Sequence, residues 1–541
     1  MMLGRSAHPD NFARDHLPPP ETWPRFLLER FDYSEELNAA TELTDRMVER
    51  GFGDNVALIG HGRMRTYKEL TDWTNRLARA LVEDLGVVPG NRVLIRSANN
   101  PAMVACWLAA LKAGAVVTNT VQSLKVADLG KIIDKAEVKL ALCDTRLMDE
   151  LVTAAKSSHF LKKVIGFDGT ANFDAELDRI ALGKTVRFDA VRTSRDDAAI
   201  IAFSTGATGE PKAAVHFHRD LLAIADGYAK EVLGITPEDV VVGTTPLAFT
   251  FGLGGLVIFP LRFGAASVLL EETSAADLVS EIKTYKPTIA FAGPAVYHGI
   301  LALKTSPAEI ASLRVAVSAG DALPAKTFES WRARHNVPLL DGFGGTEMLH
   351  VFISNRLGEI VAGTCGRPVT GYEAKIVDDD MREAPRGTVG HLAVRGPTGC
   401  RYLDDPRQRD FVRDGWNLTG DMFLEDEDGR FHFVARADDL IVSAGEAIAA
   451  PEVEGALLSH SSVIDCAVVG IPDKERGEIV KAFIVLTPEE TGSAVAVRRL
   501  QDHVKAAIDP HKYPRSIRFV DTLPKTATGK VRRFLLRQRL P

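Results

Sequence analysis

The chain has 541 residues, of which 45% are hydrophobic and 25% are charged, an ordinary composition for a globular protein. Because single hydrophobic cores stop growing well below this length, we expect more than one domain. The formal net charge of −7 at pH 7 argues against nonspecific binding to nucleic acid, which needs a basic surface.

The cysteines and the apolar runs indicate a cytoplasmic protein without a membrane partner. The five cysteines are scattered, odd in number and without CxxC spacing, so we expect reduced thiols rather than a disulfide framework or a zinc site. The first twenty residues mix charges and prolines and contain no signal-peptide core. The longest apolar run, residues 253–261, is far too short to span a membrane.

Strand-like runs alternate with helical periodicity from residue 56 onward. Residues 56–59 and 92–96 are predicted strands. Thr66 and Glu69 have the spacing of a capping box, and the apolar residues that follow fall on one helical face. Residues 101–112 are predicted to form a helix that ends before a glycine.

The alternation continues and then becomes denser in strands. Further strands are predicted at 198–204, 240–243 and 266–270, and after residue 363 at 374–377, 391–395 and 431–434. Alternating strands and helices are typical of an α/β protein with largely parallel sheets. The strand-dense part indicates a β-rich subdomain, and the segment after residue 438 has the size of one small domain.

A loop rich in glycine and hydroxyl residues follows the predicted strand at 198–204. Residues 204–212 read Ser-Thr-Gly-Ala-Thr-Gly-Glu-Pro-Lys. Glycine lets backbone N–H groups approach a polyanion closely, the hydroxyls donate hydrogen bonds, and Lys212 supplies a positive charge. The loop lacks the Gly-Lys-Ser/Thr ending of a Walker A motif. By itself it is also compatible with an ordinary polar turn.

The loop resembles the phosphate loop of acyl-adenylating enzymes, the superfamily of acyl- and aryl-CoA ligases, firefly luciferase and peptide-synthetase adenylation domains. The resemblance runs from about residue 50 to the C-terminus, with the motifs in the family's order. It implies a large N-terminal adenylating domain at 1–437, with two α/β subdomains and a β-rich subdomain, and a small mobile α+β domain at 438–541. Thr205 and Ala207 depart from the family's commoner residues.

The same resemblance implies where ATP binds. Residues 318–324 would line the adenine side, and Phe343, in place of the commoner Tyr, would stack on adenine. Asp421 would accept hydrogen bonds from both ribose hydroxyls, although read singly it is an ordinary turn residue. The expected ATP site comprises Ser204, Thr205, Gly206, Thr208, Gly209, Lys212, Ala319, Gly320, Asp321, Asp341, Gly342, Phe343, Gly344, Asp421 and Arg436.

The resemblance also implies the catalytic residues. Thr346 would contact the α-phosphate, and Glu347 would hold Mg²⁺, a hard cation that prefers oxygen ligands. Lys530, in the segment Leu-Pro-Lys-Thr-Ala-Thr-Gly-Lys, would place a compact charge where negative charge builds during attack. Taken singly, Lys530 is more typical of a solvated surface residue.

A hinge and a coenzyme A tunnel are expected at the start of the small domain. The resemblance implies that Asp438 is the pivot and that Ser443, Gly445 and Glu446 line the path of coenzyme A. Val442 stands where many family members have Lys, although some aryl-CoA ligases are aliphatic there.

The resemblance implies that the acyl pocket is lined by the residues after the predicted strand at 240–243. Phe249, Thr250 and Phe251 precede a run of glycines, which suits a flat ring better than an alkyl chain. His350 resembles the histidine at the aryl pocket of benzoate-CoA ligases, and Ala292 and Tyr297 are further candidates for the lining. Aromatic pairs such as Phe249 and Phe251 are also common in hydrophobic cores.

These observations predict an ATP-dependent, AMP-forming ligase that joins an aromatic acid, of the benzoate or 2-aminobenzoate type, to coenzyme A. The alternatives are a medium-chain or cinnamate-type acyl-CoA ligase and a non-catalytic binding protein on the same fold. A non-catalytic protein is disfavoured by the joint presence of five expected site residues, namely Thr346, Glu347, Asp421, Arg436 and Lys530. An amino-acid adenylation module is disfavoured, because residues 246–255 contain no Asp. A homodimer is an open alternative to a single chain.

Overall fold

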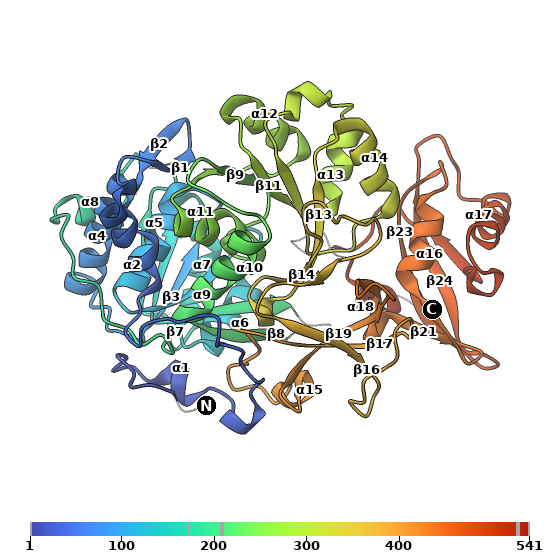
Figure 1. Cartoon of the computed structure of the whole chain (residues 1–541), viewed down its shortest axis with the longest axis horizontal. Coiled ribbons are helices and arrows are strands. Elements are labelled where there is room, and N and C mark those ends of the chain that lie inside the picture. The colour runs from blue at the N-terminus through green and yellow to red at the C-terminus, as the bar shows by residue number, and fades with distance from the viewer. Residues whose placement is uncertain (1–2, 171, 206–209, 526–530, 539–541) are drawn as a thin grey trace. The chain divides into compact units, whose positions relative to one another are not determined.

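The computed structural model describes residues 3–170, 172–205, 210–525 and 531–538 (Figure 1). Their contacts divide into two compact units, which are described separately below. The larger holds residues 3–205, 211–374 and 394–417, and the smaller holds 210, 375–393, 418–525 and 531–538. This division confirms the expected α/β class with a larger N-terminal and a smaller C-terminal part. The boundary between residues 437 and 438 stays a prediction.

The first sheet of the larger unit has six strands. Its order is β6 (Lys163–Phe167), β5 (Leu140–Asp144), β3 (Arg92–Arg96), β4 (Val116–Thr120), β7 (Ala198–Thr205) and β8 (Pro211–Phe217). The pairs are parallel except for β7 and β8, which are antiparallel. The strands predicted at 92–96 and 198–204 are therefore confirmed.

The second sheet has nine strands. Its order is β15 (Arg367–Pro368), β14 (Val351–Ser354), β13 (Leu339–Gly344), β12 (Val315–Ser318), β11 (Ile289–Ala292), β9 (Val240–Gly243), β10 (Ala266–Leu269), β1 (Val56–Gly60) and β2 (Arg63–Thr66). The strands from β13 through β1 run parallel. Because parallel strands end at one edge of a sheet, the residues that follow β12 and β13 lie close together.

Helices connect and cover these sheets, as the parallel strands require. The longer helices are α4 (Tyr67–Glu83), α5 (Pro101–Lys112), α6 (Val126–Lys135), α7 (Met148–Ser157), α12 (Ala275–Tyr285), α13 (Pro294–Ala302) and α14 (Ala325–His335). The shorter ones are α1 (Phe12–Asp15), α2 (Ala39–Leu43), α3 (Asp45–Met47), α8 (Glu176–Leu182), α9 (His218–Ile224), α10 (Thr250–Leu253), α11 (Phe259–Phe263) and α15 (Gln408–Phe411). Figure 1 shows α12, α13 and α14 grouped beside β11 and β13.

Residues 373–436 form a third, five-stranded sheet. Its order is β16 (Glu373–Val377), β17 (Gly390–Arg395), β19 (Trp416–Glu425) and β18 (Val412–Arg413), with β20 (Phe431–Arg436) paired to β19. The strands predicted at 374–377, 391–395 and 431–434 are confirmed here.

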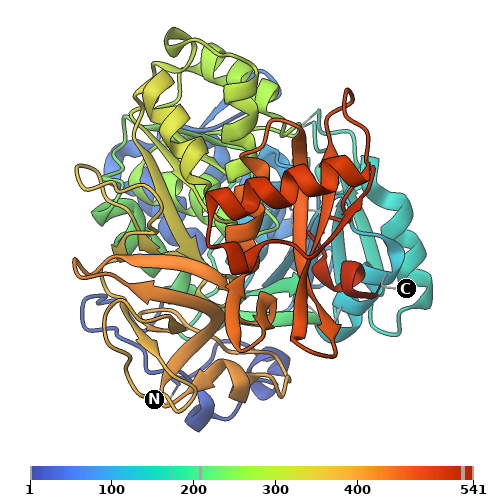
Figure 2. The same cartoon turned by 90° about the vertical axis from the view of Figure 1, so that its right-hand side faces the viewer.

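The C-terminal sheet belongs to the smaller unit. Its order is β22 (Glu446–Ala449), β21 (Leu440–Ser443), β24 (Gly477–Leu486) and β23 (Val463–Asp473), with β25 (Ser516–Phe519) paired to β24. The helices are α16 (Ala450–Leu458), α17 (Ala494–Ala507) and α18 (Arg533–Gln538). Figure 2 shows α17, in red, in front of the strands, where Leu500 and Val504 pack into the core.

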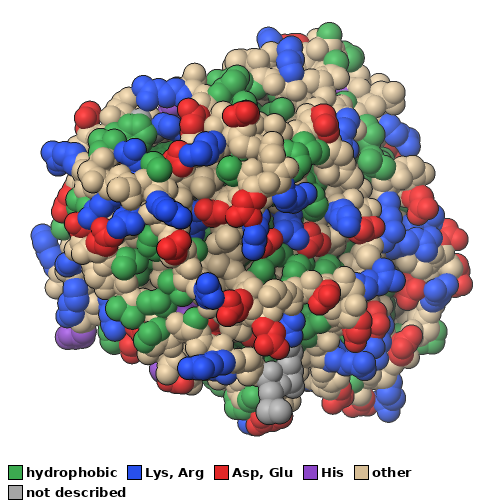
Figure 3. Space-filling view, turned by 60° about the vertical axis from the view of Figure 1, so that its left-hand side comes forward, with side chains coloured by type: hydrophobic (Ala, Val, Ile, Leu, Met, Phe, Trp, Pro, Cys, Tyr) green, Lys and Arg blue, Asp and Glu red, His purple; other side chains and the backbone are tan. Residues whose placement is uncertain are grey.

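Opposite charges are mixed on the face of the molecule shown in Figure 3, and no patch of a single sign dominates it. Within the described residues, no helix combines the length and the hydrophobicity needed to cross a membrane.

The capping box predicted at Thr66 is present. The Thr66 side chain accepts a hydrogen bond from Glu69 N at 3.2 Å, and Glu69 Oε2 accepts one from Thr66 N at 2.8 Å. We expect Thr66→Ala to lower the free energy of unfolding by ~1 kcal/mol, since it leaves an N–H at the start of α4 unpaired. Thr66→Ser keeps the hydroxyl and serves as the control in denaturant unfolding. Equal stability of the two variants would contradict a role for the cap.

Candidate active site

The predicted phosphate loop joins two antiparallel strands, β7 and β8. Ser204 is paired with Lys212 and Thr205 with Pro211 across the mouth of this hairpin. The Lys212 ammonium group lies 5.4 Å from the centre of the Tyr402 ring. The predictions for Gly206, Thr208 and Gly209 lie outside the described residues. The hairpin therefore holds Lys212 at the end of a buried strand.

The Thr346–Met348 turn follows β13. It is a 3₁₀ turn, η7 (Thr346–Met348), and the residue after it, Leu349, has a positive φ of 72°. The hydroxyl of Tyr402 donates to Glu347 Oε1 at 2.5 Å. Burial and the nearby Glu347 carboxylate raise the pKa of Tyr402, so its hydroxyl stays a donor. The Glu347 carboxylate is thus held in place by a neutral group.

The two motifs expected around adenine are neighbours. Ser318, at the end of β12, pairs with Asp341 on β13. The segment that starts with Ala319 therefore follows β12 at the same edge of the sheet where residues 345–347 follow β13. Ala319 is buried, whereas Gly320 and Asp321 are exposed. Gly320 has a φ of +92°, a conformation that favours glycine.

Within this segment, Asp341 is buried, and burial raises its pKa well above the ordinary value. The ring of Phe343 packs edge-to-face on Phe352 with centroids 5.5 Å apart. Gly342 and Gly344 both face β14, where an added Cβ would lie 2.9 Å from a Val351 methyl and 2.5 Å from His350 O. The glycines therefore allow the close approach of two backbones.

A cluster of aromatic side chains surrounds His350, one turn beyond Glu347. Its Nε2 donates to the carbonyl of Phe251 at 3.3 Å. The nearest ring centroids are those of Phe259 at 4.5 Å, Phe251 at 5.3 Å and Tyr228 at 5.5 Å. His350 is buried, and burial lowers its pKa to about 3, so the imidazole is neutral at pH 7.

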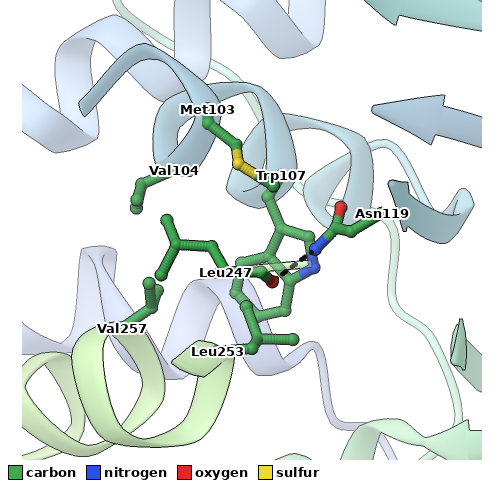
Figure 4. Close-up of a pocket in the computed structure, with 7 residues that line it drawn as sticks. All are labelled: Met103, Val104, Trp107, Asn119, Leu247, Leu253 and Val257. Atoms are coloured by element: carbon green, nitrogen blue, oxygen red, sulfur yellow. Dashed lines mark hydrogen bonds between the residues drawn. The ribbon is translucent and has the colours of Figure 1, made fainter. Parts of the chain in front are cut away.

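The segment that carries Phe249, Thr250 and Phe251 has two faces. Phe249 and Phe251 are half-buried and Thr250 is buried. Phe251 faces His350, whereas Leu247, Leu253 and Val257 pack against α5 in the apolar contact of Figure 4, beside Met103, Val104, Trp107 and Asn119. There Asn119 Nδ2 donates to Leu247 O at 3.3 Å. The α5 helix thus packs against the apolar side chains of the 247–257 segment and supports it.

The other two residues predicted to line the acyl pocket lie in a hydrophobic core. Ala292 and Tyr297 are fully buried in the cluster that contains Trp331. The Tyr297 hydroxyl donates to Val317 O at 2.8 Å, and its ring packs edge-to-face on Trp331. This placement favours a packing role for Tyr297, because both its hydroxyl and its ring have protein partners.

The remaining described candidates belong to the smaller unit. Asp421 pairs with Arg436 across β19 and β20, and Arg436 Nε lies 4.0 Å from Asp421 Oδ1. Asp438 lies in the 3₁₀ turn η8 (Ala437–Asp439), and Arg537 donates to its carbonyl at 2.8 Å.

The coenzyme A candidates lie in a hairpin between β21 and β22. Ser443 pairs with Glu446, and between them Ala444 and Gly445 both have positive φ, the geometry of a tight hairpin turn. Lys530 lies outside the described residues, so its placement stays a prediction.

Two buried residues that support the Thr346–Met348 turn were not singled out from the sequence, namely His216 and Tyr402. His216 Nε2 donates to Thr346 O at 2.8 Å. His216 could have been found from the two-residue period of a strand, because it lies four residues after Lys212 and therefore on the same face of β8. No local pattern in the sequence indicates Tyr402, since its contact with Glu347 joins residues far apart in sequence.

The comparisons with known proteins cover most of the chain. The model of the AMP-binding enzyme family matches residues 46–401, and that of the AMP-binding enzyme C-terminal domain matches residues 452–530. Benzoate–CoA ligase of Thauera aromatica is 36% identical over 509 residues, which cover 93% of this chain and 96% of that protein.

Two solved structures extend this similarity to the fold. The crystal structure of an anthranilate CoA ligase in complex with anthranoyl-AMP has a TM-score of 0.87 at 32% identity and covers 94% of this chain and 98% of its own. A benzoate CoA ligase from Burkholderia xenovorans LB400 has a TM-score of 0.83 at 32% identity, with coverage of 93% and 99%.

Gly254 provides a test of the packing around His350. A Cβ atom at Gly254 would lie 2.4 Å from His350 Cδ2, so we expect Gly254→Ala to displace the imidazole and to cost ~1–3 kcal/mol of stability. Gly130→Ala, in α6, is the control, because its Cβ would meet nothing within 4 Å. Thermal unfolding of both variants checks this. An unchanged Gly254→Ala protein would contradict the close packing.

Proposed function

Because the chain belongs to the AMP-binding enzyme family, its activity is that of an AMP-forming acid–thiol ligase, and we propose that the acid is aromatic, of the benzoate or 2-aminobenzoate type. The observation that carries this proposal is the aromatic cluster around neutral His350, three residues beyond Glu347. A flat apolar ring suits such a lining, and its carboxylate would then lie toward the Thr346–Glu347 turn. The relatives named for benzoate and anthranilate support the same choice of acid.

Thr250 supports the choice of 2-aminobenzoate within this class. It is buried beside Phe249 and Phe251, and its hydroxyl can accept or donate a hydrogen bond. We propose that it contacts a substituent next to the carboxylate on the ring. The solved anthranilate CoA ligase supports this finer proposal.

In the first half-reaction, the acid's carboxylate attacks the α-phosphorus of ATP and pyrophosphate leaves. Charge spreads over the phosphate oxygens, so catalysis depends on positioning and on cationic stabilisation. We assign this stabilisation to Lys212, Thr346 and Lys530. Lys212 supports the assignment, since β8 holds it at the phosphate loop.

Glu347 fits a magnesium ion. Its half-buried carboxylate accepts a hydrogen bond from Tyr402, and a carboxylate has further lone pairs that a hard cation can use. We propose that Glu347 would hold Mg²⁺, which neutralises negative charge on the phosphates when it is bound.

In the second half-reaction, the thiol of coenzyme A attacks the acyl-adenylate carbonyl and AMP leaves. We propose that residues 438–541 form a domain that turns about Asp438 between the half-reactions, and that Ser443, Gly445 and Glu446 then line the coenzyme A path. A turn at Asp438 between two strands supports a pivot there.

Location in the cytoplasm and assembly as a homodimer are further proposals. All five cysteines are buried thiols, as expected in a reducing compartment. Cell fractionation tests the first proposal, and sedimentation equilibrium of the purified protein tests the second.

A substrate panel tests the aromatic acid. Thioester formation is measured with ATP, Mg²⁺, coenzyme A and, in turn, benzoate, 2-aminobenzoate, 3- and 4-hydroxybenzoate, cinnamate and hexanoate. We expect the highest kcat/KM with benzoate or 2-aminobenzoate. A preference for hexanoate or cinnamate would contradict the proposal and favour the medium-chain or cinnamate-type alternative.

Lys530→Ala tests whether Lys530 acts in the first half-reaction and not in the second. We expect loss of acyl-adenylate formation, because the charge at the α-phosphate is removed, while thioester formation from supplied acyl-adenylate is largely kept. Lys525→Ala, on the same segment, is the control, since Lys525 pairs with Asp465 at 2.6 Å. Equal loss of both half-reactions in Lys530→Ala would contradict this assignment.

A further inference from the structure

His216 lies on β8 and joins the phosphate-loop hairpin to the Thr346–Met348 turn. Its side chain is fully buried. A carbonyl oxygen can only accept, so Nε2 carries the proton in its 2.8 Å contact with Thr346 O. His216 lies four positions after Lys212 on the same strand, so both side chains lie on the same face. One strand therefore carries both Lys212, which we propose binds phosphate, and the side chain that donates to Thr346 O.

The turn is held at each of its three residues. Thr346 O accepts from His216 and from Leu349 N, the latter at 3.1 Å. Glu347 accepts from Tyr402, and Met348 O accepts from Thr398 Oγ1 at 2.7 Å. Of these contacts, that of His216 is the one made by a side chain from the phosphate-loop hairpin.

The His216 ring lies beside a buried ion pair. Its Nδ1 lies 3.8 Å from Asp220 Oδ2, and Asp220 pairs with Arg401. Burial alone would raise the pKa of Asp220, but Arg401 lowers it below the ordinary value, so the carboxylate stays charged. Asp220 also accepts from Phe217 N at 2.9 Å, which fixes it at the start of α9.

We infer that His216 is a positioning residue for the adenylation half-reaction, which it serves by holding the Thr346–Glu347 backbone in register with Lys212. The inference rests on the proposed function, because it assigns Thr346 and Glu347 to ATP. A displacement of about 1 Å at such groups costs up to ~100-fold in rate. Removing the donor therefore slows attack at the α-phosphorus, whereas thiol transfer takes place after pyrophosphate has left and no longer needs this register with Lys212.

Three substitutions at His216 test this inference. His216→Gln places an amide N–H near the position of Nε2, His216→Asn is too short to reach Thr346 O, and His216→Met removes the donor. His218→Gln is the matched control, because His218 is also fully buried on the same segment but accepts from Ala39 N. Adenylation is measured as pyrophosphate release with ATP, Mg²⁺ and benzoate, and thiol transfer is measured from supplied benzoyl-adenylate.

We expect the adenylation rate to fall by about 10- to 100-fold in His216→Asn and His216→Met. In His216→Gln it should stay within about threefold of the wild-type rate, and in His218→Gln it should be little changed. The rate of thiol transfer should be largely kept in all four variants. If His216→Met does not fold, the comparison of His216→Gln with His216→Asn still tests the inference. Equal adenylation rates in Gln and Asn, or parallel loss of both half-reactions, would overturn the inference. A wild-type enzyme inactive with every aromatic acid would instead contradict the proposed function.

Discussion

The buried ion pair between Arg401 and Asp220 is the interaction on which the placement of the phosphate-loop hairpin beside the Thr346–Met348 turn depends. Both side chains are fully buried, and removing one partner would leave an uncompensated charge, at a cost of ~3–5 kcal/mol. The pair joins two segments far apart in sequence. The 401–403 segment also pairs with β8 through Val215 N to Arg401 O and Leu403 N to Ala213 O, both at 2.8 Å.

This pairing places Tyr402 between β8 and the Thr346–Met348 turn. On one side Ala214 forms a bridge with Tyr402, and on the other the Tyr402 hydroxyl holds Glu347. The same turn continues into His350, whose ring packs in the aromatic cluster. Groups proposed for phosphate, metal and acid are therefore fixed by one connected set of buried contacts, which limits their reorganisation during reaction.

Much of the fold could be predicted from the sequence, because local patterns decide it. The capping box at Thr66 and the helix at 101–112 depend on residues within one or two turns, and both are confirmed. The strands at 56–59 and 240–243 were found from short apolar runs, and both are present. Their order in the nine-stranded sheet depends on distant pairings that no local pattern encodes.

The site was less predictable where function depends on contacts between distant segments. The link between Tyr402 and Glu347 could not be found without the fold, and the aromatic character of Tyr297 did not distinguish a pocket from a core. The assignments of Gly206, Thr208, Gly209 and Lys530 fall outside the described residues and depend on the sequence alone.

In the proposed mechanism, an aromatic acid and ATP react directly, before coenzyme A takes part. The most direct measurement is the exchange of labelled pyrophosphate into ATP, with Mg²⁺ and benzoate or 2-aminobenzoate but without coenzyme A. We expect exchange that requires the acid, and formation of AMP rather than ADP when pyrophosphate is removed. Absence of exchange with every aromatic acid, or formation of ADP, would contradict it.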